Sequence, residues 1–255
     1  MTRNDLDLSG RTALVTGSSR GIGQAIAGLF AQYGATVGIH SSDADEAAQT
    51  AVAVEKACGR RVECFVADLS EAGAGRDLAR AAIARFGAVD MVVVNASIQV
   101  RQPFLQVTPD AFSRQVVVNL TSTFELLQEL LPGMAERKWG RVLTIGSVQQ
   151  VKPNPNLAAY AALKSAQANL AANLARQYAA SGVTVNNLAP GLIDTDRNAD
   201  LKQDSMAYAA ILSRIPGGRA GTPTECAWPA LLLCSEAGSY ITGIDLMVDG
   251  GLHLP

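Results

Sequence analysis

Short runs of β-branched and other apolar residues alternate along this chain with longer, alanine-rich stretches of helical character. Seven such runs are expected to be strands, at residues 12–16, 36–40, 62–66, 91–95, 141–147, 183–189 and 246–249. Most of these runs are apolar throughout, which is typical of parallel strands that are buried on both faces. The pattern therefore predicts an α/β fold, with a doubly wound, Rossmann-like parallel sheet and helices on both faces.

The chain is expected to form a single domain over residues 1–255, because no linker, repeat or low-complexity stretch divides it. Hydrophobic residues make up 48% and charged residues 17% of the sequence, which excludes a disordered chain. One polar segment, residues 194–220, breaks the alternation. It follows the sixth predicted strand, at the sheet edge where such folds bind ligands, so we interpret it as a substrate lid.

Charge and composition exclude several classes of partner. The net charge of −2 and the pI near 5.7 leave no basic surface for nucleic acid or an anionic membrane. No apolar run approaches the roughly 18 residues of a membrane span, and no signal peptide is evident, so a cytoplasmic location is expected. The four cysteines lack metal-ligand spacing and are interpreted as structural, and no metal is expected.

A glycine-rich loop, Thr16-Gly17-Ser18-Ser19-Arg20-Gly21-Ile22-Gly23, joins the first predicted strand to the first predicted helix. A helix N-terminus offers unpaired N–H groups and partial positive charge, and glycine lets a pyrophosphate reach them. The expected dinucleotide contacts are Gly17, Ser19, Arg20, Gly21, Ile22 and Gly23. One alternative is the G-x-S-x-G elbow of hydrolases, for which only His253 is available as a base. Another is a glycine turn without a ligand.

Tyr160 and Lys164 are four residues apart, and so lie on one face of the helix predicted over residues 157–181. A free phenol titrates near pH 10, and a nearby ammonium group stabilises the phenolate and lowers that pKa. Ser147 ends a predicted strand, where its hydroxyl can bond a substrate oxygen. Together these residues predict proton transfer at a carbonyl or an alcohol.

At this point the sequence resembles the short-chain dehydrogenase/reductase family, in its single-domain branch, along nearly the whole chain. The matching segments are the loop at residues 16–23, Asp68-Leu69, Asn95-Ala96, Asn119, Ser147, Tyr160 with Lys164, Pro190-Gly191 followed by Thr195, residues 240–243 and residues 248–251. The family commonly has Asn-Asn-Ala-Gly after its fourth strand. Here the corresponding residues are Val94-Asn95-Ala96-Ser97, which adds a side chain beside the cofactor ribose.

The resemblance implies a homotetramer that moves a hydride between a nicotinamide and a substrate carbon. It implies that Tyr160 is the general acid/base and that Ser147 orients the carbonyl or alcohol. It also implies that Lys164 lowers the pKa of the tyrosine and binds the nicotinamide ribose, and that Asn119 holds a water that relays protons. The further dinucleotide contacts that it implies are Asp68, Leu69, Asn95, Ala96, Tyr160, Lys164, Pro190, Gly191, Ile193 and Thr195.

The end of the second predicted strand favours NADP(H), with NAD(H) as the alternative. NAD-binding members of this fold place a carboxylate about 20 residues after the glycines, where this chain has Ser41. Arg20 and the hydroxyls of Ser41 and Ser42 are suited to the extra phosphate of NADP. Asp43 is interpreted as a helix cap with Glu46 behind it.

The segment at residues 95–104 looks like the Asn-Ala-Gly-Ile-Gln-Arg-Arg segment of gluconate 5-dehydrogenase-like members. A sugar acid, polyol or ketose is therefore the expected small-molecule substrate, and its predicted contacts are Gln99, Ser147, Gln149 and Asn154. The alternative is a 3-oxoacyl carrier-protein reductase, for which Arg101, Arg137 and Lys138 are a candidate docking patch. A non-catalytic nucleotide-binding regulator is a third alternative, against which the complete catalytic set argues.

Overall fold

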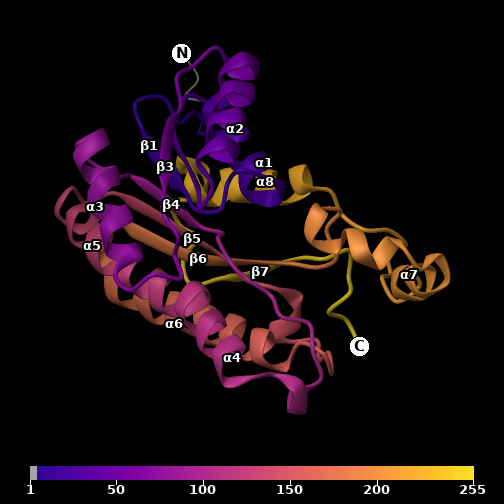
Figure 1. Cartoon of the computed structure of the whole chain (residues 1–255). Coiled ribbons are helices and arrows are strands. Elements are labelled where there is room, and N and C mark those ends of the chain that lie inside the picture. The colour runs from indigo at the N-terminus through magenta and orange to yellow at the C-terminus, as the bar shows by residue number, and fades with distance from the viewer. Residues whose placement is uncertain (1–4) are drawn as a thin grey trace.

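The computed structural model describes residues 5–255 and confirms the doubly wound α/β architecture. Its strands are β1 (Thr12–Val15), β2 (Thr36–Ser41), β3 (Glu63–Val66), β4 (Met91–Val94), β5 (Gly140–Ile145), β6 (Val183–Pro190) and β7 (Asp245–Val248). They form one parallel sheet in the order β3-β2-β1-β4-β5-β6-β7 (Figure 1). The chain reverses direction across the sheet between β1 and β4, so the loops after these two strands part and leave a crevice.

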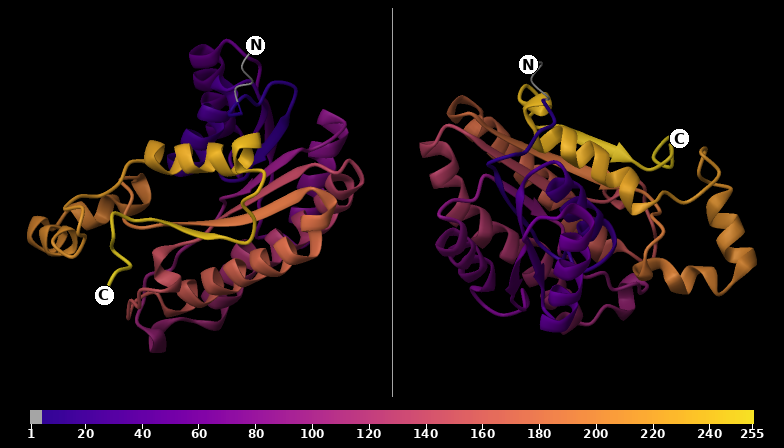
Figure 2. Two further views of the ribbon diagram at one scale, coloured as in Figure 1. Left: turned by 180° about the vertical axis from the view of Figure 1, so that it is seen from behind. Right: turned by 90° about the horizontal axis from the view of Figure 1, so that it is seen from above.

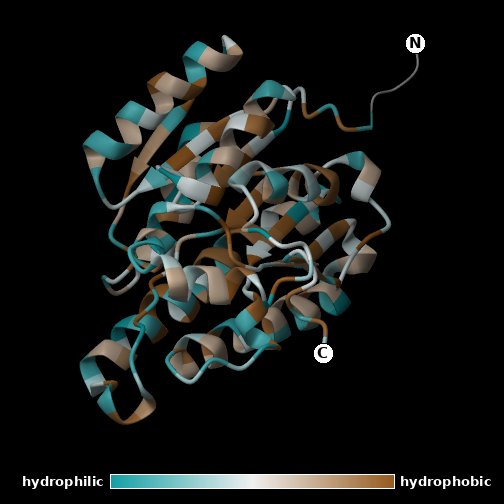
Figure 3. Ribbon diagram, turned by 90° about the vertical axis from the view of Figure 1, so that its right-hand side faces the viewer, coloured by the Kyte–Doolittle hydropathy of each residue, from teal (hydrophilic) through white to brown (hydrophobic). Residues whose placement is uncertain are grey.

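Helices cover both faces of the sheet, as Figures 1 and 2 show. One face carries α1 (Gly21–Gln32), α2 (Ala44–Cys58) and α8 (Pro223–Cys234), and the other carries α3 (Ala74–Phe86), α4 (Pro109–Val116), α5 (Ser122–Glu136) and α6 (Ala158–Tyr178). Hydrophobic residues are concentrated in the strands and the helix sides that face them (Figure 3). Within residues 5–255, no helix is long and apolar enough to cross a bilayer.

The four cysteines are free thiols. Cys226 and Cys234 lie buried in α8, and burial raises the pKa of each to about 12. A thiol with such a pKa stays protonated and unreactive at neutral pH. The interpretation of these two cysteines as structural is therefore supported.

The sequence of residues 109–134 has a helical pattern that is interrupted near Asn119, and the structure confirms this interruption. A π-helical turn, Val117–Thr121, joins α4 to α5. The Asn119 Oδ1 accepts from the Ile98 N–H at 2.8 Å, and its Nδ2 donates to the Ile98 carbonyl at 2.9 Å. The side-chain amide therefore fixes the backbone of the loop that follows β4.

Residues 194–220 leave the sheet after β6 and stand away from it in both views of Figure 2. They contain a 3-10 helix, Asp196–Lys202, and the helix α7 (Ser205–Leu212). The two ends of the segment meet at its base, where Asp194 N–H donates to the Gly221 carbonyl at 2.8 Å and Gly221 N–H donates to the Leu192 carbonyl at 2.9 Å. The segment is thus a long insertion whose two ends lie side by side.

His40, at the end of β2, connects the loops that follow the two neighbouring strands, β1 and β3. Its Nδ1 accepts from the Gly17 N–H at 3.0 Å, and its Nε2 lies 3.1 Å from the Ala67 carbonyl. Because one partner is a donor and the other an acceptor, the ring must be neutral with its proton on Nε2. Burial lowers the pKa of His40 to about 4.

Neutral His40 makes folding sensitive to acid. Its pKa is about 4 in the folded protein and about 6.5 in an unfolded chain, so the unfolded state binds the proton first as the pH falls. Between pH 7.5 and 5, the unfolding free energy of the wild type should fall about 2 kcal/mol further than that of His40→Asn. Urea unfolding at both pH values measures this, and equal losses in the two proteins would contradict it.

Candidate active site

A cleft of about 470 Å³ opens at the carboxyl ends of β1, β2, β4, β5 and β6. The predicted site residues that line it are Gly17, Ser19, Arg20, Gly21, Ile22, Ser41, Ser42, Asp68, Leu69, Asn95, Ala96, Gln99, Ser147, Gln149, Asn154, Tyr160, Pro190, Gly191, Ile193 and Thr195. Three predicted residues, Gly23, Asn119 and Lys164, lie behind this lining rather than on it. The structure thus brings residues from most of the chain to one place.

The glycine loop passes very close to the backbone that follows β4. Gly17 has a φ of +60°, and a Cβ at this position would lie 2.8 Å from the Ala96 Cα. Asn95 holds the two segments together by donating from Nδ2 to the carbonyls of Thr16 at 3.0 Å and Gly17 at 2.7 Å. A Cβ at Gly23 would lie 2.5 Å from the same amide nitrogen. Glycine at position 23 is therefore required for this packing.

The N-terminus of α1 fits a pyrophosphate. The helix begins at Gly21, and its N-cap residue Arg20 makes no side-chain hydrogen bond to the first turn. The N–H groups of that turn are therefore not satisfied by a capping side chain, and they face a cleft that Ser19, Arg20 and Gly21 line. A helix end with uncapped donors and partial positive charge is suited to an anionic group.

Glu46 enters the part of the cleft at the end of β2. Asp43 caps α2 as predicted, because its carboxylate accepts from the N–H groups of Asp45 and Glu46. The Glu46 side chain does not return to Asp43, as the cap pattern had suggested. Its Oε2 accepts from the hydroxyls of Ser19 at 2.8 Å and Ser41 at 3.2 Å. Its Oε1 lies 3.5 Å from the Arg20 Nη1, so the carboxylate contacts the residues that were expected to bind the extra phosphate of NADP.

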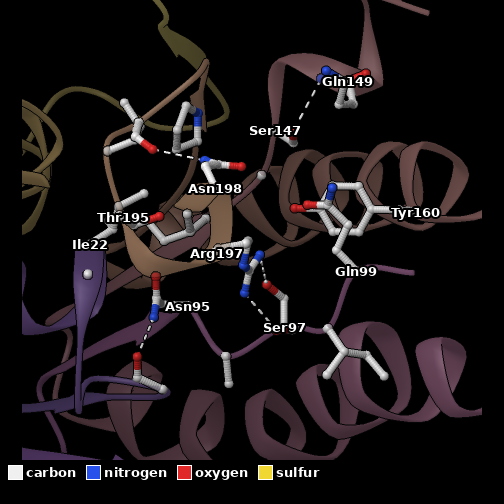
Figure 4. Close-up of a pocket in the computed structure, with 18 of the residues that line it drawn as sticks. Ile22, Asn95, Ser97, Gln99, Ser147, Gln149, Tyr160, Thr195, Arg197 and Asn198 are labelled. Carbon is white, nitrogen blue, oxygen red and sulfur yellow. Dashed lines mark hydrogen bonds between the residues drawn. The ribbon is translucent and has the colours of Figure 1, made fainter. Parts of the chain in front are cut away.

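Ser147 follows β5, two residues beyond the end of the strand, and caps the 3-10 turn Val148–Gln150. Its Oγ accepts from the Gln149 N–H at 3.2 Å (Figure 4). The Gln149 side-chain oxygen is buried and has no hydrogen-bond partner within residues 5–255. Both residues line the cleft beside Tyr160, so a hydroxyl and an unsatisfied carbonyl oxygen are available to a substrate.

Tyr160 lies almost fully buried at the start of α6, with its ring at the wall of the cleft. Burial raises the pKa of its hydroxyl, while the charge of Arg197 and hydrogen bonds with Ser147, Ser97 and Arg197 oppose that rise. The Lys164 Nζ lies 5.8 Å from the centre of the Tyr160 ring. Arg197 is therefore a second cation near the phenol, beside the Lys164 that the resemblance implies.

Lys164 is buried behind Tyr160. Its Nζ donates to the Ile145 carbonyl at 2.6 Å and to the Gln167 Oε1 at 2.9 Å. Burial, together with the charge of Arg197, lowers the pKa of Lys164 to about 7. The amine therefore changes its protonation state near neutral pH, as a residue that passes protons at neutral pH must.

Sequence reasoning missed three residues of the site, namely His40, Glu46 and Arg197. The Glu46 side chain was explained by a helix cap, and His40 carried no signal beyond its place near a strand end. Arg197 lies in the polar segment at residues 194–220, where no periodicity shows which side chains turn toward the cleft. Asp68 and Leu69, which were expected only from the resemblance, do line the cleft.

Comparisons with known proteins agree with this geometry. A family model described as enoyl-(acyl carrier protein) reductase matches residues 17–253. The chain is 38% identical over 245 residues to 2-dehydro-3-deoxy-D-gluconate 5-dehydrogenase of Pseudoalteromonas atlantica. The aligned region covers 96% of each protein.

Two solved structures share the fold over nearly their whole length. One is a 3-oxoacyl (acyl-carrier-protein) reductase from Agrobacterium tumefaciens with NADP bound, with a TM-score of 0.93, 45% identity, and coverage of 98% of this chain and 97% of that one. The other is a gluconate 5-dehydrogenase from Burkholderia cenocepacia in complex with NADP and tartrate, with a TM-score of 0.92, 35% identity, and the same coverage. Because these likenesses extend along almost the entire sequence, the chain belongs to the short-chain dehydrogenase/reductase family of oxidoreductases.

Proposed function

We propose that this protein moves a hydride between NADP(H) and a secondary alcohol or ketone of a sugar acid, polyol or ketose. The observation that carries the proposal is the position of Tyr160 and Ser147 in the same cleft as the uncapped N-terminus of α1. A bound nicotinamide supplies or accepts the hydride. The side chains of the protein bind both partners and handle the proton.

In the proposed mechanism, Tyr160 exchanges a proton with the substrate oxygen while the Ser147 hydroxyl holds that oxygen in place. Arg197 stabilises the negative charge that is left on the phenol. Lys164 lies behind Tyr160 and, with a pKa of about 7, passes protons to and from it. The family role of Asn119 is to hold a water, and we propose that its amide also positions the loop at Ile98.

The variant Tyr160→Phe tests the assignment of the acid/base. Loss of the phenol proton should lower kcat by roughly 10²-fold or more, with little change in NADPH affinity, because the proton is needed only when charge develops on the substrate. Tyr178→Phe, at the far end of the same helix, is the matched control and should keep its activity. If Tyr160→Phe keeps more than about a tenth of the wild-type kcat, Tyr160 is not the acid/base.

We propose NADP(H) as the cofactor because Arg20, Ser41 and Ser42 offer a guanidinium and two hydroxyls where NAD-binding members of the fold place a carboxylate on the strand end. The two solved relatives both hold NADP. Glu46 opposes this preference, because its carboxylate contacts Ser19, Ser41 and Arg20 in the same part of the cleft. The wild type should therefore bind NADPH more weakly than its basic and hydroxyl groups alone would allow.

The variant Glu46→Gln should tighten NADPH binding by roughly 3–10-fold and leave NADH binding nearly unchanged. The substitution removes the charge that repels the extra phosphate but keeps an oxygen for the two serine hydroxyls. Asp45→Asn removes the neighbouring carboxylate, which does not line the cleft, and is the control. Titrations that follow dinucleotide fluorescence give both constants, and equal changes for the two dinucleotides would refute this role of Glu46.

The alternative of a 3-oxoacyl carrier-protein reductase is supported by the similarity to the Agrobacterium enzyme. Its expected docking patch does not assemble, because Arg101 lies at the cleft whereas Arg137 and Lys138 precede β5, at the opposite end of the sheet. The Arg137 side chain is also engaged, donating to the Val89 carbonyl at 2.8 Å. Amide groups of Gln99, Gln149 and Asn154 at the cleft suit a substrate with several hydroxyls.

A substrate panel separates the alternatives. Wild-type protein is assayed with NADPH and with NADH against oxo derivatives of sugar acids, ketoses, simple ketones and 3-oxoacyl thioesters. The expected result is fastest turnover of a polyhydroxylated oxo compound with NADPH. Turnover of the thioesters alone would establish the carrier-protein reductase. Dinucleotide binding without turnover of any class would indicate a non-catalytic regulator.

We propose that the chain works as a homotetramer in the cytoplasm, without nucleic-acid or membrane partners. Tyr240 and Ile244, next to the edge strand β7, and Trp228 and Leu232 on α8 are exposed hydrophobic residues of the kind found at subunit interfaces. The four free thiols suit a reducing compartment. The insertion at residues 194–220 is proposed to be a substrate lid, because it lines the cleft and its two ends are hydrogen-bonded to each other.

A further inference from the structure

Arg197 reaches from the segment after β6 to the loop after β4, on the opposite side of the cleft (Figure 4). Its Nη1 donates to the Ser97 Oγ at 3.0 Å and its Nη2 donates to the Ser97 carbonyl at 2.8 Å. A guanidinium has five N–H donors, so two bonds fix its position and leave other donors for a ligand. The Arg197 side chain is thus fixed in position and still has N–H donors that can bind a ligand.

The charge of Arg197 is not neutralised within residues 5–255, because the side chain forms no ion pair with any carboxylate of that range. Several arginines outside the cleft are paired, as Arg219 is with Glu225 at 2.6 Å. The ionisable groups that feel the charge of Arg197 are Tyr160 and Lys164, and it lowers the pKa of each. An unpaired guanidinium beside a buried amine is an environment that favours a bound anion.

Ser97 and Arg197 belong together in this chain. Ser97 stands where the family commonly has glycine, and glycine would lack the Oγ that receives one of the two hydrogen bonds. The backbone at Ser97 has no positive φ, so the position accepts a side chain without strain. The departure from the family pattern in the β4 loop therefore provides the support for the cation.

We infer that Arg197 binds a carboxylate of the substrate, one or two carbons from the carbon that exchanges the hydride. A guanidinium holds a carboxylate through two parallel N–H···O bonds, and Arg197 lines the same cleft as Tyr160 with its charge acting on the Tyr160 hydroxyl. A substrate whose oxygen bonds to Tyr160 and whose carboxylate bonds to Arg197 must therefore carry these two groups close together. The unpartnered oxygen of Gln149 accepts from a further hydroxyl. This inference rests on the proposed function and narrows its substrate to hydroxy acids and oxo acids.

The test compares two ligands that differ in charge and share a hydroxylated four-carbon skeleton. L-tartrate carries carboxylates next to its hydroxyls, and threitol of the same configuration carries uncharged CH₂OH groups instead. Each is titrated calorimetrically into protein with saturating NADP⁺. The wild type should bind tartrate roughly tenfold or more tightly than threitol, and Arg197→Gln should lose that preference while its weak threitol affinity stays the same.

Two further variants make the result specific. Arg197→Lys keeps the charge but loses the paired donors, and it should retain part of the preference for tartrate. Arg114→Gln removes a different cleft arginine, whose charge acts on Asp68, and should bind tartrate as the wild type does. The inference is overturned if Arg197→Gln binds tartrate as tightly as the wild type, or if Arg114→Gln weakens it equally.

A fluorescence titration with NADPH alone separates this inference from the proposed function. Absence of dinucleotide binding would refute the oxidoreductase assignment. In that case the affinities for tartrate and threitol are compared in the protein without dinucleotide, and this comparison still decides the role of Arg197. Dinucleotide binding together with an Arg197-independent tartrate affinity would leave the proposed function standing and refute the carboxylate site.

Discussion

The close contact between two backbones, at Gly17 and Ala96, is the constraint on which the rest of the site depends. It brings the loop after β1 against the loop after β4, where the order of the sheet reverses. The contact is held by the amide of Asn95 and by neutral His40, which also reaches the end of β3. Because these bonds set the direction of α1, they also set the place where its N-terminus meets an anionic ligand.

The positively charged side chains at the two ends of the cleft differ in whether a carboxylate lies beside them. At the end of β2, Arg20 faces the carboxylate of Glu46, so its charge is already partly balanced. At the end of β5, Lys164 is buried and has a pKa of about 7, while Arg197 has no carboxylate partner within residues 5–255. An anionic substrate is therefore stabilised most beside the reacting phenol of Tyr160. At the dinucleotide end, by contrast, the extra phosphate of NADP is repelled by the carboxylate of Glu46.

Most of the fold and the outline of the site follow from local patterns. Apolar runs and helical periodicity predicted seven strands in a doubly wound sheet, and the glycine loop predicted the position of the cleft. Glu46 and Arg197 were not predicted, because their contacts join residues that are far apart in sequence or lie in a segment without periodicity. The interruption near Asn119 was visible as a break in the helix pattern. Its contact with Ile98 was not, because 21 residues separate the two.

A crystal structure of the protein with NADP⁺ would show whether the cleft holds the dinucleotide against Tyr160. The pyrophosphate should lie at the N-terminus of α1, the extra phosphate near Arg20, and the nicotinamide in the cleft with its reactive carbon facing Tyr160. A dinucleotide bound elsewhere, or a nicotinamide that lies outside the cleft and away from Tyr160, would contradict this arrangement of the site.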